Sequence, residues 1–231
     1  MNDGDSRLRR IHIAKSSSHQ SAVERGIVTE PFQYIDSLEG RKHIILVYDD
    51  QMEGKMIQFR FLRNGLRLGE SCFYLTHQEP QVVEREMTKS GMIDAAQWVK
   101  KGLLHIYSIP DISQEKEGML EGCEKVLKMI QKFKPPYRIV GRAIADVSTE
   151  MSMEVEYVLE KVFHSKFERI DGSFLCHYDW SQIGGNRLRW VEKLSRTHHA
   201  IIFATRFRRG MAFNLDSYFH TAPLGSPVGE I

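Results

Sequence analysis

The chain has 231 residues, of which 42% are hydrophobic and 27% are charged, and this is an ordinary globular composition. Its net charge of +2 excludes the strongly basic balance of many proteins that bind nucleic acids or membrane surfaces, so we expect neither partner. No stretch approaches the roughly 20 apolar residues of a membrane-spanning helix. The three cysteines, Cys72, Cys123 and Cys176, form no CxxC pair, which predicts a reduced, cytoplasmic protein without disulfides.

In chain order, residues 1–40 are polar and irregular, and we expect an N-terminal tail with at most one docking segment. From His43 onward, buried-strand patterns alternate with helical periodicity, which is typical of an α/β sheet. The predicted strands are 43–48, 72–76, 103–107, 137–145, 173–177 and 200–204.

Three apolar stripes with helical spacing lie between these strands, and we expect all three to be core faces. Gly65 and Gly69 predict a left-handed cap at the end of the first helix, and Pro135-Pro136 ends the second. The stripes are Met52, Met56, Phe59, Leu62 and Leu66; Met119, Cys123, Val126, Leu127, Ile130 and Phe133; and Met151, Val155, Val158, Leu159 and Val162.

Parallel strands need crossover helices, and these crossovers are right-handed. We therefore predict one three-layer α/β domain over residues 41–205, with a mostly parallel sheet and helices on both faces. Residues 206–231 shift to Gly and Pro without lasting periodicity, and we expect a partly docked C-terminal tail.

The stretch after the first strand resembles a phosphate-binding loop, GxxxxGK[ST], but departs from it at two positions. Gly54 and Lys55 stand where the loop needs them, whereas Asp49 replaces the first glycine and Met56 replaces the Mg²⁺-binding hydroxyl. Nearby acids would repel a triphosphate. The pattern favours a lost nucleotide site, with Lys55 as an exposed residue at the helix start and Asp49 or Asp50 as its cap.

Several segments together resemble one family, the methanogen/methylotroph, DcmR-like sensory domain (MEDS), over residues 43–205. They are "HIILVYDD", "FLRNGLRLGESCFYLTHQEP", "LLHIYSIPD", "FLCHYDWSQI" and "THHAII". The matching positions are His43, Tyr48, Gly65, Gly69, Glu70, Leu175, Cys176, Tyr178, Asp179 and His198 or His199.

This family is similar to the RecA/KaiC-like ATPases, so the resemblance implies a RecA-like fold without its phosphate loop. It also implies a sensory or regulatory role that involves small organic ligands. Glu79 falls where the KaiC-like ATPases place a catalytic glutamate, and Asp146 resembles the aspartate that holds magnesium in those enzymes. Both residues lack the phosphate loop that such chemistry requires.

Ligands bind open α/β sheets outside the carboxyl ends of the strands. The candidate ligand-binding residues there predict an aromatic-lined cleft with several carboxylates, suited to a small polar or cationic ligand. The alternative is that these side chains cap helices and close hydrogen bonds. The candidates are Tyr48, Asp49, Lys55, His77, Glu79, Asp146, Tyr178 and Asp179.

The sequence predicts no metal ion, no cofactor and no catalytic residue. The ten histidines show no metal-ligand spacing, and His198 and His199 would face opposite sides of a strand. We expect Cys176 to be a small, buried hydrophobic residue. Three functions stay open: a non-catalytic sensory domain, an interaction scaffold that binds a protein partner or its own copies, and a residual nucleotide-binding ATPase.

Overall fold

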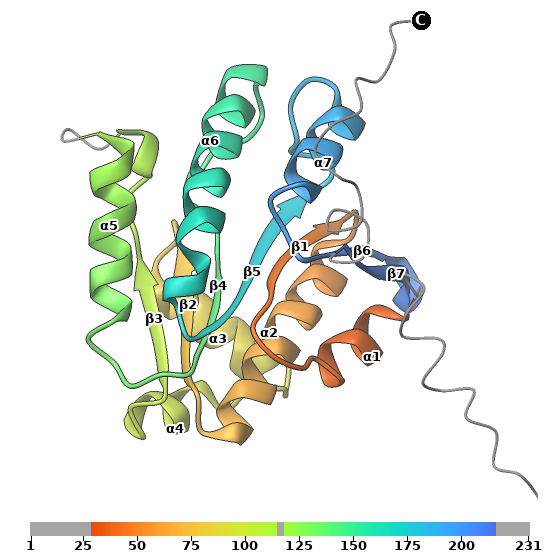
Figure 1. Ribbon diagram of the computed structural model, residues 1–231. Coiled ribbons are helices and arrows are strands. Elements are labelled where there is room, and N and C mark those ends of the chain that lie inside the picture. The colour runs from red at the N-terminus through yellow and green to blue at the C-terminus, as the bar shows by residue number, and fades with distance from the viewer. Residues whose placement is uncertain (1–28, 115–117, 216–231) are drawn as a thin grey trace, which may run out of the picture.

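A computed structural model of the protein describes residues 29–114 and 118–215, so most of the predicted N-terminal tail and the end of the predicted C-terminal tail lie outside the described residues. These residues form a seven-stranded sheet of order β3-β2-β4-β5-β1-β6-β7, in which only the β6–β7 pair is antiparallel (Figure 1). The strands are β1 (His43–Tyr48), β2 (Ser71–Thr76), β3 (Leu104–Ser108), β4 (Tyr137–Gly141), β5 (Gly172–Asp179), β6 (Ala200–Thr205) and β7 (Arg209–Asn214).

Helices cover both faces of the sheet, and each face packs its own hydrophobic core (Figure 1). One face carries α1 (Pro31–Asp36), α2 (Gln51–Leu68), α3 (Pro80–Lys89) and α4 (Ala95–Lys100). The other carries α5 (Met119–Ile130), α6 (Glu150–Lys166) and α7 (Arg187–Ser195). Short 3-10 turns are η1 (Ile112–Gln114), η2 (Phe167–Arg169) and η3 (Arg206–Arg208). The predicted three-layer, mostly parallel α/β architecture is confirmed. None of the described helices is long and apolar enough to cross a membrane.

Each of the six predicted strands is present: β1 has the predicted bounds, and the other five differ at one or both ends. The fourth strand stops at Gly141 instead of reaching Ala145, because the chain turns there and Arg142 donates hydrogen bonds to the carbonyl oxygens of Ile144 and Ala145. Two further elements lie within the segments for which we expected tails: helix α1 and edge strand β7.

Most residues of the predicted stripes are core residues, but three expectations were wrong. Met52 is 75% exposed, Met151 is 79% exposed and Val158 is 44% exposed. On α6 the sheet-facing side is rotated from the predicted stripe. Its fully buried residues are Met153, Glu156, Leu159 and Glu160.

The turn that ends α2 explains the glycines and the glutamate of the family pattern. Gly69 caps α2 with φ 77°, a left-handed conformation that favours glycine. A Cβ at Gly65 would lie 2.5 Å from Cδ of Arg138, whose Nε donates to Oε2 of Glu70 at 2.6 Å. The close approach of α2 to β4 therefore requires a glycine at position 65. The ion pair between Arg138 and Glu70 holds the end of the helix against the strand.

Candidate functional site

A cleft of about 270 Å³ opens at the carboxyl ends of β1, β2, β4 and β5. The chain leaves β1 and β2 toward the α2–α4 face, and leaves β4 and β5 toward the α6–α7 face (Figure 1). Loops that diverge in this way leave a crevice in open α/β sheets, and ligands bind there. The lining residues are Tyr48, Gln51, Lys55, Tyr74, Leu75, Thr76, His77, Gln78, Glu86, Arg142, Ala145, His177 and Gln182.

Lys55 forms one wall of this cleft. Its Nζ donates to the hydroxyl of Tyr74 at 3.0 Å and lies 3.1 Å from Oε2 of Glu86. Burial alone would lower the pKa of Lys55, but the interactions with Tyr74 and Glu86 outweigh burial and raise it. Lys55 is therefore a positive charge in the cleft, and 30% of its side chain is exposed.

The glycine beside Lys55 serves packing. Helix α2 begins at Gln51, so Gly54 and Lys55 lie within the helix, and Asp50 caps it by accepting from the backbone N–H of Glu53 at 3.1 Å. A Cβ at Gly54 would lie 2.6 Å from the ring of Tyr48. Burial, followed by the charge of Asp179, raises the pKa of Tyr48 to about 12, so its hydroxyl stays neutral.

Two histidines and an arginine also line the cleft: His77, His177 and Arg142. The ring nitrogens of His77 lie 3.2 Å from the carbonyl oxygens of Ile109 and Arg142, which joins the ends of β2, β3 and β4. Nδ1 of His177 is buried and has no hydrogen-bond partner within the described part of the chain. Burial, followed by the charge of Arg142, depresses the pKa of His177 well below 6.5, so the ring is neutral.

The cleft unites three of the predicted binding residues, Tyr48, Lys55 and His77. Three predicted acids lie outside it and are exposed: Asp49, Glu79 and Asp146. Hydrogen bonding by Ser148 lowers the pKa of Asp146, whose Oδ1 accepts from the Ser148 N–H at 2.8 Å.

Asp179 and Tyr178 also lie outside the cleft. Asp179 is buried and accepts from the N–H and the hydroxyl of Ser181, at 2.9 and 2.6 Å. Tyr178 packs in the core on the α5–α7 face. The cleft is therefore lined by two cations, Lys55 and Arg142, and one carboxylate, Glu86, in place of the several carboxylates that we expected.

A second group of polar side chains is buried between the sheet and α6, and we call it the His–Cys–Glu cluster. It consists of His43, Glu160, Cys176 and His198, each at most 7% exposed. One nitrogen, oxygen or sulfur atom from each residue lies within 4.8 Å of the others. His43 opens β1, Cys176 lies on β5, Glu160 lies on α6 and His198 precedes β6.

The two imidazoles of the cluster have defined tautomers. Nδ1 of His43 lies 3.0 Å from the carbonyl oxygen of Thr197, and Nδ1 of His198 lies 2.7 Å from that of Leu194. A carbonyl oxygen only accepts, so Nδ1 donates in both rings. Burial, followed by the charge of His43, lowers the pKa of His198 to about 3, so its Nε2 carries a lone pair.

Beside the cluster, two glutamates share one tyrosine. The hydroxyl of Tyr178 lies 2.8 Å from Oε1 of Glu156 and 2.6 Å from Oε1 of Glu160. Burial and the charge of Glu160 raise the pKa of Glu156 to about 8. Burial alone would also raise the pKa of Glu160, but His198, His43 and the Tyr178 hydroxyl lower it. Glu156 is therefore a neutral acid and Glu160 is the ionised partner.

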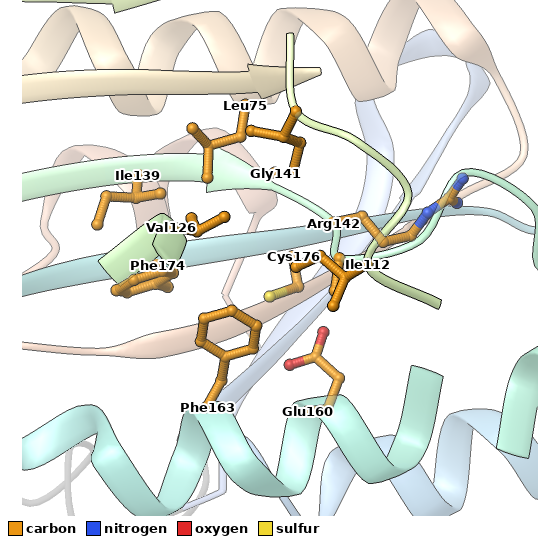
Figure 2. Close-up of a pocket in the computed structure, with 12 residues that line it drawn as sticks. Leu75, Ile112, Val126, Ile139, Gly141, Arg142, Glu160, Phe163, Phe174 and Cys176 are labelled. Atoms are coloured by element: carbon orange, nitrogen blue, oxygen red, sulfur yellow. The ribbon is translucent and has the colours of Figure 1, made fainter. Parts of the chain in front are cut away.

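An apolar cavity of about 30 Å³ borders the cluster, and Figure 2 shows Glu160 and Cys176 on its wall with Phe163 and Phe174. Arg142 lines both this cavity and the cleft. Leu75 lines both as well, so the two sites meet at two residues. They also share β5, on which His177 faces the cleft and Cys176 faces the cluster.

The sequence pointed to part of this cluster without identifying it. His43, Cys176 and one of His198 and His199 were positions of the family resemblance, but no metal-ligand spacing joined them. Glu160 was missed altogether. The available signal was a pair of glutamates, Glu156 and Glu160, four residues apart on a helix with an apolar face.

Comparison with known proteins agrees with this architecture. The model of the family "MEthanogen/methylotroph, DcmR Sensory domain" (MEDS) matches residues 42–199. A similar solved structure is the KaiC-like protein PH0186 from the hyperthermophilic archaeon Pyrococcus horikoshii OT3, with a TM-score of 0.52. The two are 12% identical, and the match covers 76% of this chain and 77% of that chain. No curated protein matches the sequence.

The structural likeness shows a RecA/KaiC-like fold, as the resemblance implied. The family match spans more than half of the sequence and includes all four residues of the His–Cys–Glu cluster and all the residues that line the cleft. This chain belongs to the MEDS family of sensory domains.

Proposed function

We propose that this domain is a non-catalytic sensor that binds a small organic molecule carrying one negative group in the cleft at the carboxyl ends of the strands. The observation that carries the proposal is the charge of the lining, which contains two cations, Lys55 and Arg142, and a single carboxylate, Glu86. A carboxylate ligand would accept charge-assisted hydrogen bonds from both cations. The cleft volume of about 270 Å³ suits a molecule of only a few heavy atoms.

The unpartnered nitrogen of His177 supports the same proposal. A buried polar atom without a hydrogen-bond partner costs free energy, and a ligand that donates to Nδ1 would recover it. A hydroxy acid offers both groups, a carboxylate for the cations and a hydroxyl for His177. The sequence predicted a small polar or cationic ligand, and within that range the lining favours a polar one, a small hydroxycarboxylate.

We also propose that the phosphate loop is lost. The ring of Tyr48 occupies the space above Gly54, and only Asp49 and Asp50 separate β1 from α2. Met56 offers no oxygen to a magnesium ion. These features oppose the residual-ATPase alternative.

A sensor must pass its signal on, and we propose that it does so by binding a protein partner or a second copy of this chain. We also propose that this takes place in the cytoplasm, a location that suits three free, buried cysteines.

Titration calorimetry of the full chain tests this function. We expect small hydroxycarboxylates to bind more tightly than the matching amides and amines. The Lys55→Gln variant should weaken carboxylate binding about tenfold or more, because a hydrogen bond to a charged group contributes about 1.5–3 kcal/mol. Glu86→Gln should strengthen it, because the change removes the one carboxylate beside Lys55.

Lys100→Gln is the matched control, since Lys100 is an exposed lysine at the end of α4 and does not line the cleft. Its affinity should equal that of the unchanged protein. Equal binding of amides and carboxylates, or a Lys55→Gln variant with full affinity, would overturn the proposed ligand class. We expect Mg-ATP to leave the melting temperature of the protein unchanged. Magnesium-dependent ATP binding would instead favour the nucleotide-binding alternative.

A further inference from the structure

We propose that the His–Cys–Glu cluster is a binding site for a divalent transition-metal ion of the zinc type. The four donors would be Nε2 of His43, Nε2 of His198, Sγ of Cys176 and a carboxylate oxygen of Glu160. Two imidazoles, a thiolate and a carboxylate are a donor set that such borderline ions accept. This site is separate from the cleft, and the metal proposal does not depend on the ligand proposed for the cleft.

The hydrogen bonds of the cluster leave two of its buried polar atoms without a partner. Both imidazoles give their Nδ1 proton to a backbone carbonyl, so both turn Nε2 toward the centre of the cluster. They face Oε2 of Glu160, at 3.2 Å from His43 and 3.6 Å from His198. Neither Oε2 of Glu160 nor Nε2 of His198 has a hydrogen-bond partner in the described part of the chain. These two unpartnered atoms lie beside Nε2 of His43 and Sγ of Cys176, and a cation bound between the four side chains would satisfy both of them.

The donor separations match a tetrahedral ion. With metal–ligand bonds of about 2.0–2.3 Å, neighbouring donors of a tetrahedral site lie about 3.3–3.8 Å apart. Nε2 of His43 lies 3.3 Å from Sγ of Cys176 and 3.2 Å from Oε2 of Glu160. The widest separation in the cluster is within 4.8 Å, so closing it requires a movement of about 1 Å.

The charges of such a site would balance. On binding, Zn²⁺ displaces the proton of the Cys176 thiol, which leaves to solvent, and a sulfur–zinc bond replaces the sulfur–hydrogen bond. One thiolate and the carboxylate of Glu160 then neutralise the two positive charges of the ion. A buried site with no net charge avoids the large cost of an unpaired charge in the core. This balance suits residues that are each at most 7% exposed.

The surrounding contacts orient the donors as metal sites do. Metal-bound histidines usually donate their second ring nitrogen to a carbonyl or carboxylate, which fixes the ring. Here the carbonyl oxygens of Thr197 and Leu194 have this role, and the Tyr178 hydroxyl holds the other oxygen of Glu160 at 2.6 Å. The cavity of about 30 Å³ beside Glu160 and Cys176 gives both side chains room to close on an ion (Figure 2).

Metal analysis of the full chain, purified without chelators and dialysed against metal-free buffer, tests the site. We expect about one bound Zn²⁺ per chain. Reconstitution of the metal-free protein with Co²⁺ should give the visible bands of a tetrahedral ion and a thiolate-to-cobalt charge-transfer band. Calorimetry with Zn²⁺ in buffers of different ionisation enthalpy should report proton release, because the thiol of Cys176 must lose its proton to bind the ion.

Variants assign the donors. Cys176→Ser should abolish the charge-transfer band, and Glu160→Gln or His198→Gln should weaken Zn²⁺ binding more than about 100-fold, since losing a secondary contact alone costs about 10–100-fold. Cys72→Ser is the matched control, because Cys72 is an equally buried cysteine on the other face of the sheet, and it should keep the band.

The result for the unchanged protein decides the proposal even where a variant fails to fold. A folded protein that takes up neither Zn²⁺ nor Co²⁺ would overturn it and would leave a proton as the occupant of the cluster. A charge-transfer band that survives Cys176→Ser but disappears in Cys72→Ser would overturn it as well. Failure of carboxylate binding in the cleft would leave these measurements unchanged.

Discussion

At the scale of single residues, Glu156 makes the stability of the fold depend on pH. Its carboxyl group is fully buried on α6, and burial raises its pKa from 4.5 to about 8. The unfolded chain loses this proton above about pH 4.5, whereas the folded chain keeps it until about pH 8. Between these values the unfolded state binds fewer protons, so rising pH destabilises the fold.

We therefore predict that this group lowers the free energy of unfolding as pH rises from 5 to 8, by at most about 1.4 kcal/mol per pH unit for one proton. Urea denaturation of the unchanged protein and of Glu156→Gln measures the effect. Both proteins contain the same remaining ionisable groups, so the difference between them isolates Glu156. A difference that stays constant over this pH range would show that Glu156 is already ionised in the folded protein.

At the scale of elements, helix α1 depends on tertiary contacts. It has six residues, too few for a stable isolated helix. Nε of Arg60 on α2 donates to Oδ1 of Asp36 at 2.7 Å, and Nδ2 of Asn64 donates to the same atom at 3.0 Å. Hydrogen bonding by Arg60 lowers the pKa of Asp36 to about 2. The stability that the ionised carboxylate of Asp36 gives to the docked helix is thus complete above about pH 3.8, and it is lost as pH falls toward 2.

Replacing this carboxylate should release α1 without unfolding the sheet. We predict that Asp36→Ala speeds hydrogen exchange several-fold at the amides of Tyr34 and Ser37, which donate within α1, and leaves the strand amides protected. Glu39→Ala is the control, because Glu39 is an exposed acid just beyond the helix. Unchanged exchange in Asp36→Ala would mean that apolar packing of Phe32 and Ile35 alone holds α1 in place.

The elements also show what the sequence could and could not predict. Strands β1, β2 and β5 are apolar runs, and their residues alone identified them. Helix α6 was placed correctly along the chain, but its buried face was misjudged because glutamates normally belong at the surface. Glu156 and Glu160 lie inside because Tyr178 and the histidines provide partners, and those partners come from distant segments. Local periodicity contains no information about such partners.

The candidate site likewise has one feature that the sequence could predict and one that it could not. The location of the cleft was predictable, because parallel strands place their carboxyl ends at one edge of the sheet. Its charge was not, because Asp49, Glu79 and Asp146 turn away from the cleft while Lys55, Glu86 and Arg142 line it. Side-chain direction in loops depends on local hydrogen bonds, such as the one that Asp146 accepts from Ser148.

At the scale of the whole molecule, strand β5 is the structural link between the two sites. His177 faces the cleft, whereas Cys176 and Tyr178 face the buried cluster on the other side of the sheet. Arg142 borders both the cleft and the cavity beside the cluster. The two proposed sites are therefore connected directly through β5 and Arg142.

The proposed ligand site of this sensory domain is the cleft at the carboxyl ends of the strands. The most direct test follows the assigned backbone amide resonances of the isotope-labelled protein during titration with small hydroxycarboxylates. We predict shifts concentrated at Tyr48, Lys55, His77, Arg142 and His177, with Lys100 unmoved. Shifts that concentrate at other elements, or resonances that stay unchanged at high ligand concentration, would show that the ligand does not bind in the cleft.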